Sequence, residues 1–333
     1  MARRSALLNN FVVFKFNGSM PSLGEIKVAL SRDEFQPCPK AELGPVYGWT
    51  GALTADDDNL VHGADGKILI CCLVEQKKVP SEFIKSETRK KVEQKRKSGE
   101  KVGKEERAKI MADIKADAAK TAFPVSSRLS IWIDQNKKTV LIGTSSKQHL
   151  GQILPMLSSA LPGVSIYQLM ADSSSLADLM TTWLEPQELP MELAFDDTSE
   201  SYFKSHYEDG GQAKFKQGSI QTNVVIDLIN FDEKKAVSIP FIWQSRVKFK
   251  LDRELVFSAV RFTDDVYNEA GESDAEEENK DKDEDVAGEK GLLLAKASFL
   301  IFSDQMSEFT TEILEILKPV LDNTNQASLD MVG

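Results

Sequence analysis

One short motif in the sequence has the residue types of a metal-dependent nuclease. Glu75-Gln76-Lys77 follows directly after a strongly apolar run. Such nucleases often place a Glu-x-Lys pair at the end of a strand, with an upstream aspartate that Asp65 or Asp58 could supply. The carboxylates would hold Mg²⁺, and Lys77 would polarise the attacking water or the leaving group. The same motif recurs as Glu93-Gln94-Lys95 inside a predicted helix, so a solvated strand end is the favoured interpretation.

Other catalytic patterns do not occur in the sequence. The three histidines, His62, His149 and His206, lie far apart without the spacing of metal ligands, which favours surface or packing roles. Gly-rich phosphate loops and nucleophile elbows are also missing. Of the three cysteines, Cys71 and Cys72 lie inside an apolar run, where small buried thiols are expected. We therefore expect neither a metal nor a cofactor.

Basic side chains in the second half of the chain form a candidate phosphate-binding site. Lys214 and Lys216 follow a Gly-Gly turn, and Arg246, Lys248 and Lys250 alternate along a later predicted strand. Alternation places the last three on one face, with the apolar residues between them toward the core. Such a row could follow a phosphate backbone, or it could be the solvated face of a half-buried sheet.

A second basic region lies between residues 80 and 120, which hold thirteen Lys and Arg against eight acidic residues. Residues 81–97 and 105–119 are rich in helix formers and poor in large apolar side chains, which predicts two charged helices in a projecting hairpin. The densest cations point all round the first helix, as in a helix beside DNA or in a plain solvated helix. They are Arg89, Lys90, Lys91, Lys95 and Arg96.

The net charge of −11 is concentrated in one segment. Residues 264–289 hold thirteen acidic side chains against two lysines, which accounts for all of it. The rest of the chain is balanced, with 39 basic and 39 acidic residues. Segregated charge of this kind permits one surface that faces a polyanion despite a low overall pI. The acidic stretch itself is predicted to be a solvated loop.

The apolar periodicity predicts an α+β fold with mixed or antiparallel sheets. Residues 34–66 read as loops around short extended pieces. The predicted strands cover residues 11–16, 67–74, 128–133, 139–143, 164–169, 191–195, 237–242, 246–251, 255–261 and 292–302. The predicted helices outside the hairpin cover residues 22–31, 146–161 with an internal Pro155, 175–184, about 220–229, and 306–317. No apolar run is long enough for a membrane-spanning helix, and polar residues interrupt any signal-peptide core, so we expect a cytoplasmic protein.

An ordered set of short pieces along the chain matches a known pattern. The pieces are Phe11–Phe16, Phe35, Pro37-Cys38, Gly48-Trp49, Lys67–Val74, the hairpin opened by Pro80, Ala122-Phe123, Trp132-Ile133-Asp134, Thr182-Trp183, Glu208-Asp209-Gly210-Gly211, Trp243-Gln244, Arg246, Phe249 and Arg261-Phe262. Together they resemble the RdgC family of bacterial recombination-associated DNA-binding proteins. No single motif is diagnostic, and the resemblance runs from about residue 10 to 320.

The resemblance implies a ring-shaped homodimer whose basic central hole admits duplex DNA without sequence preference. Each chain would then form half of the ring and would restrain a RecA-like recombinase on the nucleoid. Phe123 matches an aromatic residue at a dimer contact, and Lys214 and Lys216 match basic positions near the hole. Gln217 and Gly218 depart from the more polar or basic residues of the family, and the acidic insertion is longer than expected.

The favoured interpretation is a non-enzymatic DNA-binding ring dimer. The alternatives are a Mg²⁺-dependent exonuclease built on Glu75 and Lys77, and a protein-interaction factor whose acidic loop binds a recombinase. We divide the chain into an N-terminal α+β part (1–79), the charged hairpin (80–120), a central α+β part (121–262), the acidic loop (263–290) and a C-terminal strand and helix that complete the core (291–333).

Overall fold

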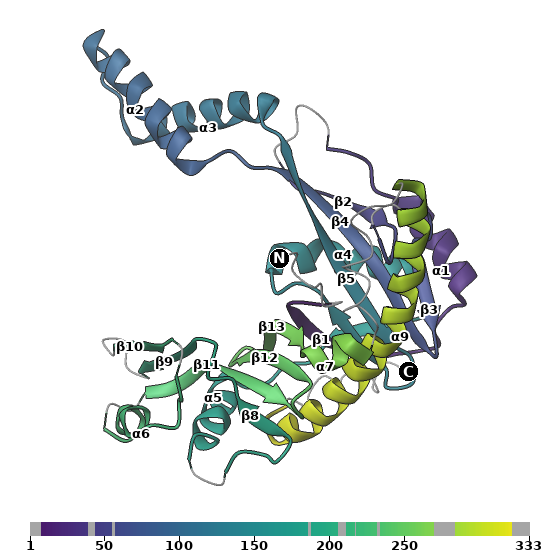
Figure 1. The fold of residues 1–333 in the computed structure, drawn as a ribbon. Helices are drawn as coiled ribbons and strands as arrows, with labels where there is room; N and C mark the ends of the chain where they lie inside the picture. Colours follow the sequence, from purple (N-terminus) through teal and green to yellow (C-terminus); the bar gives the residue numbers. More distant parts are fainter. Residues whose placement is uncertain are drawn as a thin grey trace.

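The computed structural model describes residues 8–38, 44–54, 57–185, 188–205, 211–216, 218–231, 234–269 and 284–321. Helices and strands are mixed along the chain, which confirms the predicted α+β class. Figure 1 shows the chain as an arc, with a helical hairpin at one end and a small group of strands and a helix at the other. None of the described helices is long and apolar enough to cross a membrane.

One antiparallel sheet of 13 strands runs through the arc in the order β10-β9-β11-β12-β13-β1-β6-β5-β4-β2. Three short strands join it beside this path, with β3 on β4, β7 on β1 and β8 on β11. The strands are β1 (Phe11–Asn17), β2 (Val46–Thr50), β3 (Val61–Ala64), β4 (Lys67–Lys77), β5 (Pro124–Asp134), β6 (Thr139–Ile142), β7 (Ser165–Gln168), β8 (Leu193–Phe195), β9 (Ser201–Ser205), β10 (Gln212–Phe215), β11 (Lys234–Trp243), β12 (Val247–Asp252) and β13 (Val256–Phe262).

Helices cover parts of both faces of this sheet. They are α1 (Leu23–Leu30), α2 (Ser81–Lys97), α3 (Lys104–Thr121), α4 (Lys147–Ala160), α5 (Ser173–Thr182), α6 (Asn223–Asn230), α7 (Asp264–Glu269) and α9 (Glu284–Leu317). Because strand side chains alternate, β1 contributes to two cores: Phe14 packs under α1 and α4, whereas Val13 packs on the side of α9 and α5. In Figure 1, α9 follows the outer side of the arc.

Local sequence signals explain where several of these helices begin. Ser22 and Glu25 form a capping box before α1, and the Asp172 side chain accepts a hydrogen bond from Ser175 N at the start of α5. The helix predicted over residues 146–161 is confirmed as α4, which continues through Pro155.

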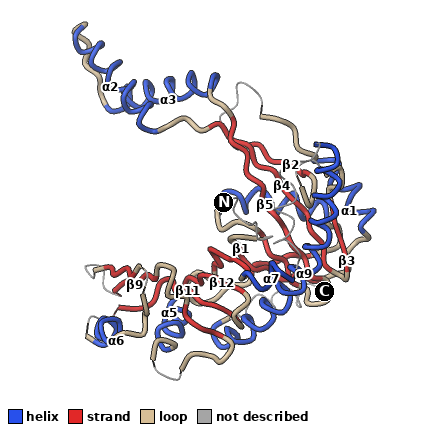
Figure 2. The backbone as a smooth tube through the Cα atoms, viewed as in Figure 1, coloured by secondary structure: helices blue, strands red, loops and turns tan. Residues whose placement is uncertain are grey.

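The charged hairpin is confirmed as α2 and α3. Figure 2 shows both helices beyond the end of the sheet, joined to it by the strands β4 and β5. These two strands pair over their full lengths, from Lys67 opposite Asp134 to Lys77 opposite Pro124. A long two-stranded ribbon therefore supports the hairpin.

The prediction of a strand over residues 292–302 is wrong, because these residues belong to the long helix α9. An apolar run of this length fits either a strand or a buried helix segment when it is read alone. The positions of the buried side chains show that the segment is helical, because these side chains recur every three or four residues on one side of α9. They are Phe299, Phe302, Met306, Phe309, Ile313 and Leu317.

The prediction of a solvated loop over residues 264–289 is also wrong at both of its ends. Asp264–Glu269 forms α7, and Glu284 begins α9. The middle of the acidic stretch, residues 270–283, lies outside the described residues. Acidic side chains at the start of a helix are favourable to the helix dipole, so a high acidic content does not exclude helix there.

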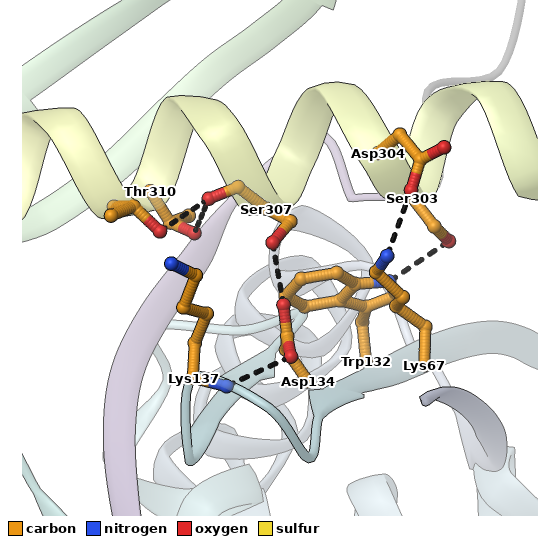
Figure 3. Close-up of polar contacts among 9 residues, drawn as sticks. Lys67, Trp132, Asp134, Lys137, Ser303, Asp304, Ser307 and Thr310 are labelled. Carbon is orange, nitrogen blue, oxygen red and sulfur yellow. Dashed lines mark hydrogen bonds and ion pairs between the residues drawn. The ribbon is translucent and has the colours of Figure 1, made fainter. Parts of the chain in front are cut away.

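A seam of polar contacts fixes α9 onto the sheet (Figure 3). The Asp134 carboxylate, 1% exposed, accepts hydrogen bonds from Ser307 Oγ at 2.5 Å and from Lys137 N at 3.0 Å. Trp132 Nε1 donates to Ser303 Oγ at 3.0 Å, and Lys67 Nζ lies 2.8 Å from Asp304 Oδ1. The aspartate at the end of β5 is thus a buried anchor for the helix.

We expect Asp134→Ala to lower the free energy of unfolding by about 3 kcal/mol, because it removes a buried charged acceptor and leaves two partly buried donors without their partner. Urea denaturation followed by circular dichroism measures this loss. Asp304→Ala is the matched control on the same seam. Its carboxylate is largely exposed, so that change should remove about 1 kcal/mol or less. Equal losses in the two variants would show that Asp134 is no anchor.

Candidate nucleic-acid interface

The strands β11, β12 and β13 present one face that no described helix covers. Phe249 of β12 packs on Phe309 of α9, with ring centroids 4.9 Å apart, so the apolar residues of β12 face the helix. Lys248 and Lys250 alternate with them and therefore point away from α9. In Figure 1, α9 lies on the outer side of the arc, so the opposite face of these strands is turned toward its inner side. Arg261 of β13 lies directly opposite Lys248. We call this surface, together with its continuation on β9 and β10, the open face.

Arg246 does not belong to this row. It follows a tight turn in which Gln244 and Ser245 both have positive φ, between β11 and β12. Its Nε donates a hydrogen bond to Gln305 Oε1 of α9. The predicted row of three cations on β12 is therefore wrong at this position, since simple alternation does not extend through the turn.

Lys214 and Lys216 lie near the β10 end of the sheet and share one carboxylate. Each ammonium is 3.5 Å from an oxygen of Glu200, and Lys214 Nζ also lies 5.2 Å from the ring centroid of Tyr202. Desolvation opposes ionisation of Glu200, but the two ammonium groups outweigh it and lower the pKa of this carboxyl. Two lysines on one glutamate leave a net positive charge, and both lysine side chains remain more than half exposed.

Lys248 is also partly neutralised, by a buried aspartate. Its Nζ lies 3.4 Å from Asp196 Oδ1. Burial raises the pKa of Asp196, yet hydrogen bonds from Thr198 and Ser199 and the charge of Lys248 lower it overall. Asp196 is therefore charged at neutral pH, and Lys248 adds little net charge to the open face.

Three other cations on the open face have no ion-pair partner among the described residues. They are Lys204 of β9, Lys250 of β12 and Arg261 of β13. The pairing of Lys204 with Gln212 and of Phe203 with Ala213 puts Lys204 on the face opposite the buried Phe203. Lys204 and Arg261 were not predicted as site residues. Alternation in their own strands could have identified both, but β9 itself was not recognised as a strand.

The hairpin carries free and paired cations. Lys90 lies 2.7 Å from Glu87, and Lys95 contacts both Glu100 at 3.0 Å and Glu106 at 2.6 Å. Hydrogen bonds to Glu106 and Glu100 raise the pKa of Lys95. The remaining three predicted cations have no ion-pair partner among the described residues and are exposed: Arg89, Lys91 and Arg96. Ion pairs this exposed contribute little stability, so the hairpin charges do not hold the fold together.

Phe123 is 88% exposed at the root of the hairpin, immediately before β5. Phe83 and Val125 are also exposed large apolar side chains. Lys77 pairs with Pro124, so the start of α2 and the start of β5 lie at the same end of the ribbon. An exposed group of apolar side chains in one place is typical of a surface that another protein chain covers.

The structure does not bring the predicted nuclease residues together with Asp65. That aspartate lies in the turn before β4, and Glu75 lies near the other end of the strand, roughly 26 Å from the first strand residue, Lys67, at 3.3 Å per residue. Both Glu75 oxygens accept hydrogen bonds, from Cys38 N at 2.7 Å and from Ser126 Oγ at 3.2 Å. Lys77 is buried, and Asp58 is exposed in the loop before β3. The described part of the chain contains no group of three His, Cys, Asp or Glu side chains that could hold a metal.

The fold and this surface define an α+β protein with one long antiparallel sheet bent into an arc, an open face of cations and a projecting helical hairpin. A family model described as "Putative exonuclease, RdgC" matches residues 7–319, so the chain belongs to the RdgC family. Among its relatives, "Recombination-associated protein RdgC" of Yersinia enterocolitica is 24% identical over 92% of this chain and 96% of its own length. The protein of the same name in Yersinia pestis is 23% identical over the same shares. The resemblance drawn from the sequence is thereby confirmed, and the chain is a recombination-associated protein of this family.

Proposed function

We propose that this protein binds duplex DNA without sequence preference as a ring-shaped homodimer and modulates strand exchange by a RecA-like recombinase. The observation that carries the proposal is the set of partnerless cations on the open face: Lys204, Lys250 and Arg261. Cations that have no internal partner attract phosphates without reading bases. Their strands face the inner side of the arc, where two copies would enclose a duplex.

Ring closure accounts for the exposed aromatic residue at the hairpin root. Two arcs that meet through Phe123 would bury its ring and bring the basic hairpins of both copies near the enclosed DNA. A closed ring slows dissociation without any base contact, because the DNA must leave through an end or through an opened interface. The names of the relatives, which refer to recombination, support a role on DNA that is being recombined.

The protein acts in this proposal by binding rather than by catalysis. Glu75 already uses both carboxylate oxygens within the protein. The description of the family model names an exonuclease, whereas the described residues contain no cluster of side chains that could hold a metal. The experiment below includes the condition that would reveal cleavage. The proposed place of action is the nucleoid.

The test is fluorescence anisotropy with a labelled duplex of about 40 base pairs at about 50 and about 200 mM salt. We expect affinity to fall by about 10³ or more across that range, which corresponds to roughly six or more phosphate contacts. Parallel samples with Mg²⁺ or EDTA, run on a denaturing gel, should contain intact DNA. DNA shortening that requires Mg²⁺ would contradict the proposal and favour the exonuclease. Absence of DNA binding at the lower salt would also contradict it and favour a protein that acts through contacts with another protein.

A further inference from the structure

An acidic side chain, Glu200, lies among the cations of the open face at its β10 end. Lys214 of β10 lies directly opposite Tyr202 of β9, and its Nζ is 5.2 Å from the centroid of the tyrosine ring. The same Nζ lies 3.5 Å from Glu200 Oε1. Phe203, the next residue of β9, is fully buried, so Tyr202 and the groups around it are on the other face of the sheet. The carboxylate of Glu200 is therefore part of the open face.

Each oxygen of this carboxylate contacts a different lysine. Oε1 lies 3.5 Å from Lys214 Nζ, and Oε2 lies 3.5 Å from Lys216 Nζ. Lysines bind phosphate groups as point charges, so two ammonium groups that share one anion are also suited to share one phosphate. The side chains of Lys214 and Lys216 are 53% and 78% exposed, which leaves both within reach of an approaching nucleic acid. Glu200 thus occupies the position that a phosphate would take.

The carboxylate that neutralises Lys248 is held differently. Asp196 is buried and accepts hydrogen bonds from Thr198 Oγ1 at 2.6 Å and from Ser199 Oγ at 2.8 Å, so it stays in place whether or not its lysine leaves. The described partners of the Glu200 carboxylate are ammonium groups of exposed lysines. Exposed ion pairs contribute little to stability, so a phosphate can replace Glu200 without disturbing the fold.

We propose that Glu200 competes with DNA phosphates for Lys214 and Lys216 and thereby limits the affinity of the open face. The inference rests on the proposed function, because it concerns the same DNA-binding surface. When a phosphate takes over the two ammonium groups, the charge of Glu200 stays close by and repels it. A ring that is retained on DNA by its closure needs only weak phosphate contacts, and weak contacts allow it to slide along the duplex.

The test is Glu200→Gln, which removes the charge and keeps the size of the side chain. In anisotropy titrations with a duplex of about 40 base pairs, the variant should bind about tenfold more tightly, or more, at about 50 mM salt. The slope of log affinity against log salt should steepen by about 2, because a dimer loses two negative charges. Glu315→Gln is the matched control. It removes the same charge from an exposed ion pair with Lys318 on another surface, and it should bind DNA like the parent protein.

A double-mutant cycle assigns the gain in affinity to the two lysines. In a protein that already carries Lys214→Ala and Lys216→Ala, Glu200→Gln should raise the affinity by less than about threefold. Equal gains with and without the lysines would overturn the inference, because Glu200 would then not act through them. A parent protein that binds DNA, together with a Glu200→Gln variant of unchanged affinity and salt slope, would overturn this inference alone. Absence of binding by both proteins at about 50 mM salt would overturn the proposed function as well.

Discussion

In the proposed ring dimer, replacement of Phe123 by serine is expected to abolish self-association. In a twofold-symmetric contact the side chain of each copy is buried, so one substitution acts twice. Burial of a phenylalanine contributes about 2 to 3 kcal/mol, so loss of both copies should weaken the dimer by roughly 10³ to 10⁴. Because Phe123 is 88% exposed in the single chain, the substitution should leave the folding stability within about 0.5 kcal/mol.

Light scattering across a series of protein concentrations measures the change from dimer to monomer. Met191→Ser is the matched control, since Met191 is 99% exposed and lies before β8, far along the chain from the hairpin. It should remain dimeric. If Phe123→Ser is as dimeric as the control, then the interface lies elsewhere. The monomeric variant should also release DNA faster, because an open arc cannot enclose a duplex.

The second large effect is expected on the open face. Replacement of Lys204, Lys250 and Arg261 by alanine removes three partnerless cations from each copy, or six from a dimer. If each contacts one phosphate, the slope of log affinity against log salt should flatten by about 5. The affinity at about 50 mM salt should fall by at least about 10². Anisotropy titrations at several salt concentrations measure both quantities.

A control triple variant removes the same number of positive charges from other surfaces. It distinguishes a specific effect of the open face from the effect of lowering the overall positive charge. Lys27, Lys296 and Lys318 are exposed on α1, on α9 and just after α9. Their replacement by alanine should change the salt slope by less than about 1. Equal losses in the two triple variants would mean that the open face does not contact DNA. Both variants should unfold at the temperature of the parent protein, since none of the six side chains is buried.

Much of the fold could be predicted from local patterns. The alternation in Val247–Asp252 and the capping residues of α1 and α5 are short-range signals that the structure retains. The long helix α9 was divided into a strand and a helix because its first apolar run lacks a clear period by itself. Its helical spacing appears only when residues 299–317 are considered together, on the side that contacts the sheet. The strands β9 and β10 are short and polar on one face, so their sequences contain little periodicity.

The candidate site was predicted less completely than the fold. Lys248 and Lys250 were placed on the correct face, but the sequence could not show that Asp196 neutralises Lys248 or that Glu200 accepts both Lys214 and Lys216. The alternating pattern of residues 246–251 predicts that Arg246 lies on the same face as Lys248 and Lys250. The pattern does not reveal the turn at Gln244 and Ser245, which directs Arg246 elsewhere. These partners come from distant segments, and only tertiary structure brings them together. The functional roles of these residues remain predictions until the two triple variants are compared.

The order of the strands has a consequence for how the chain reaches this structure. β1 pairs with β6 and β7, but it also pairs with β13, where Phe11 lies opposite Phe257. The central sheet therefore cannot be completed during synthesis until nearly the whole sequence has emerged, and α9 must then dock last on its outer side. Contacts between residues this far apart in sequence slow folding, and the edges of the incomplete sheet stay exposed until β13 has paired. The hairpin of α2 and α3, in contrast, is one continuous segment of the chain and can form early. A refolding experiment should accordingly show fast helix formation followed by a much slower step in which the tryptophans of the sheet become buried.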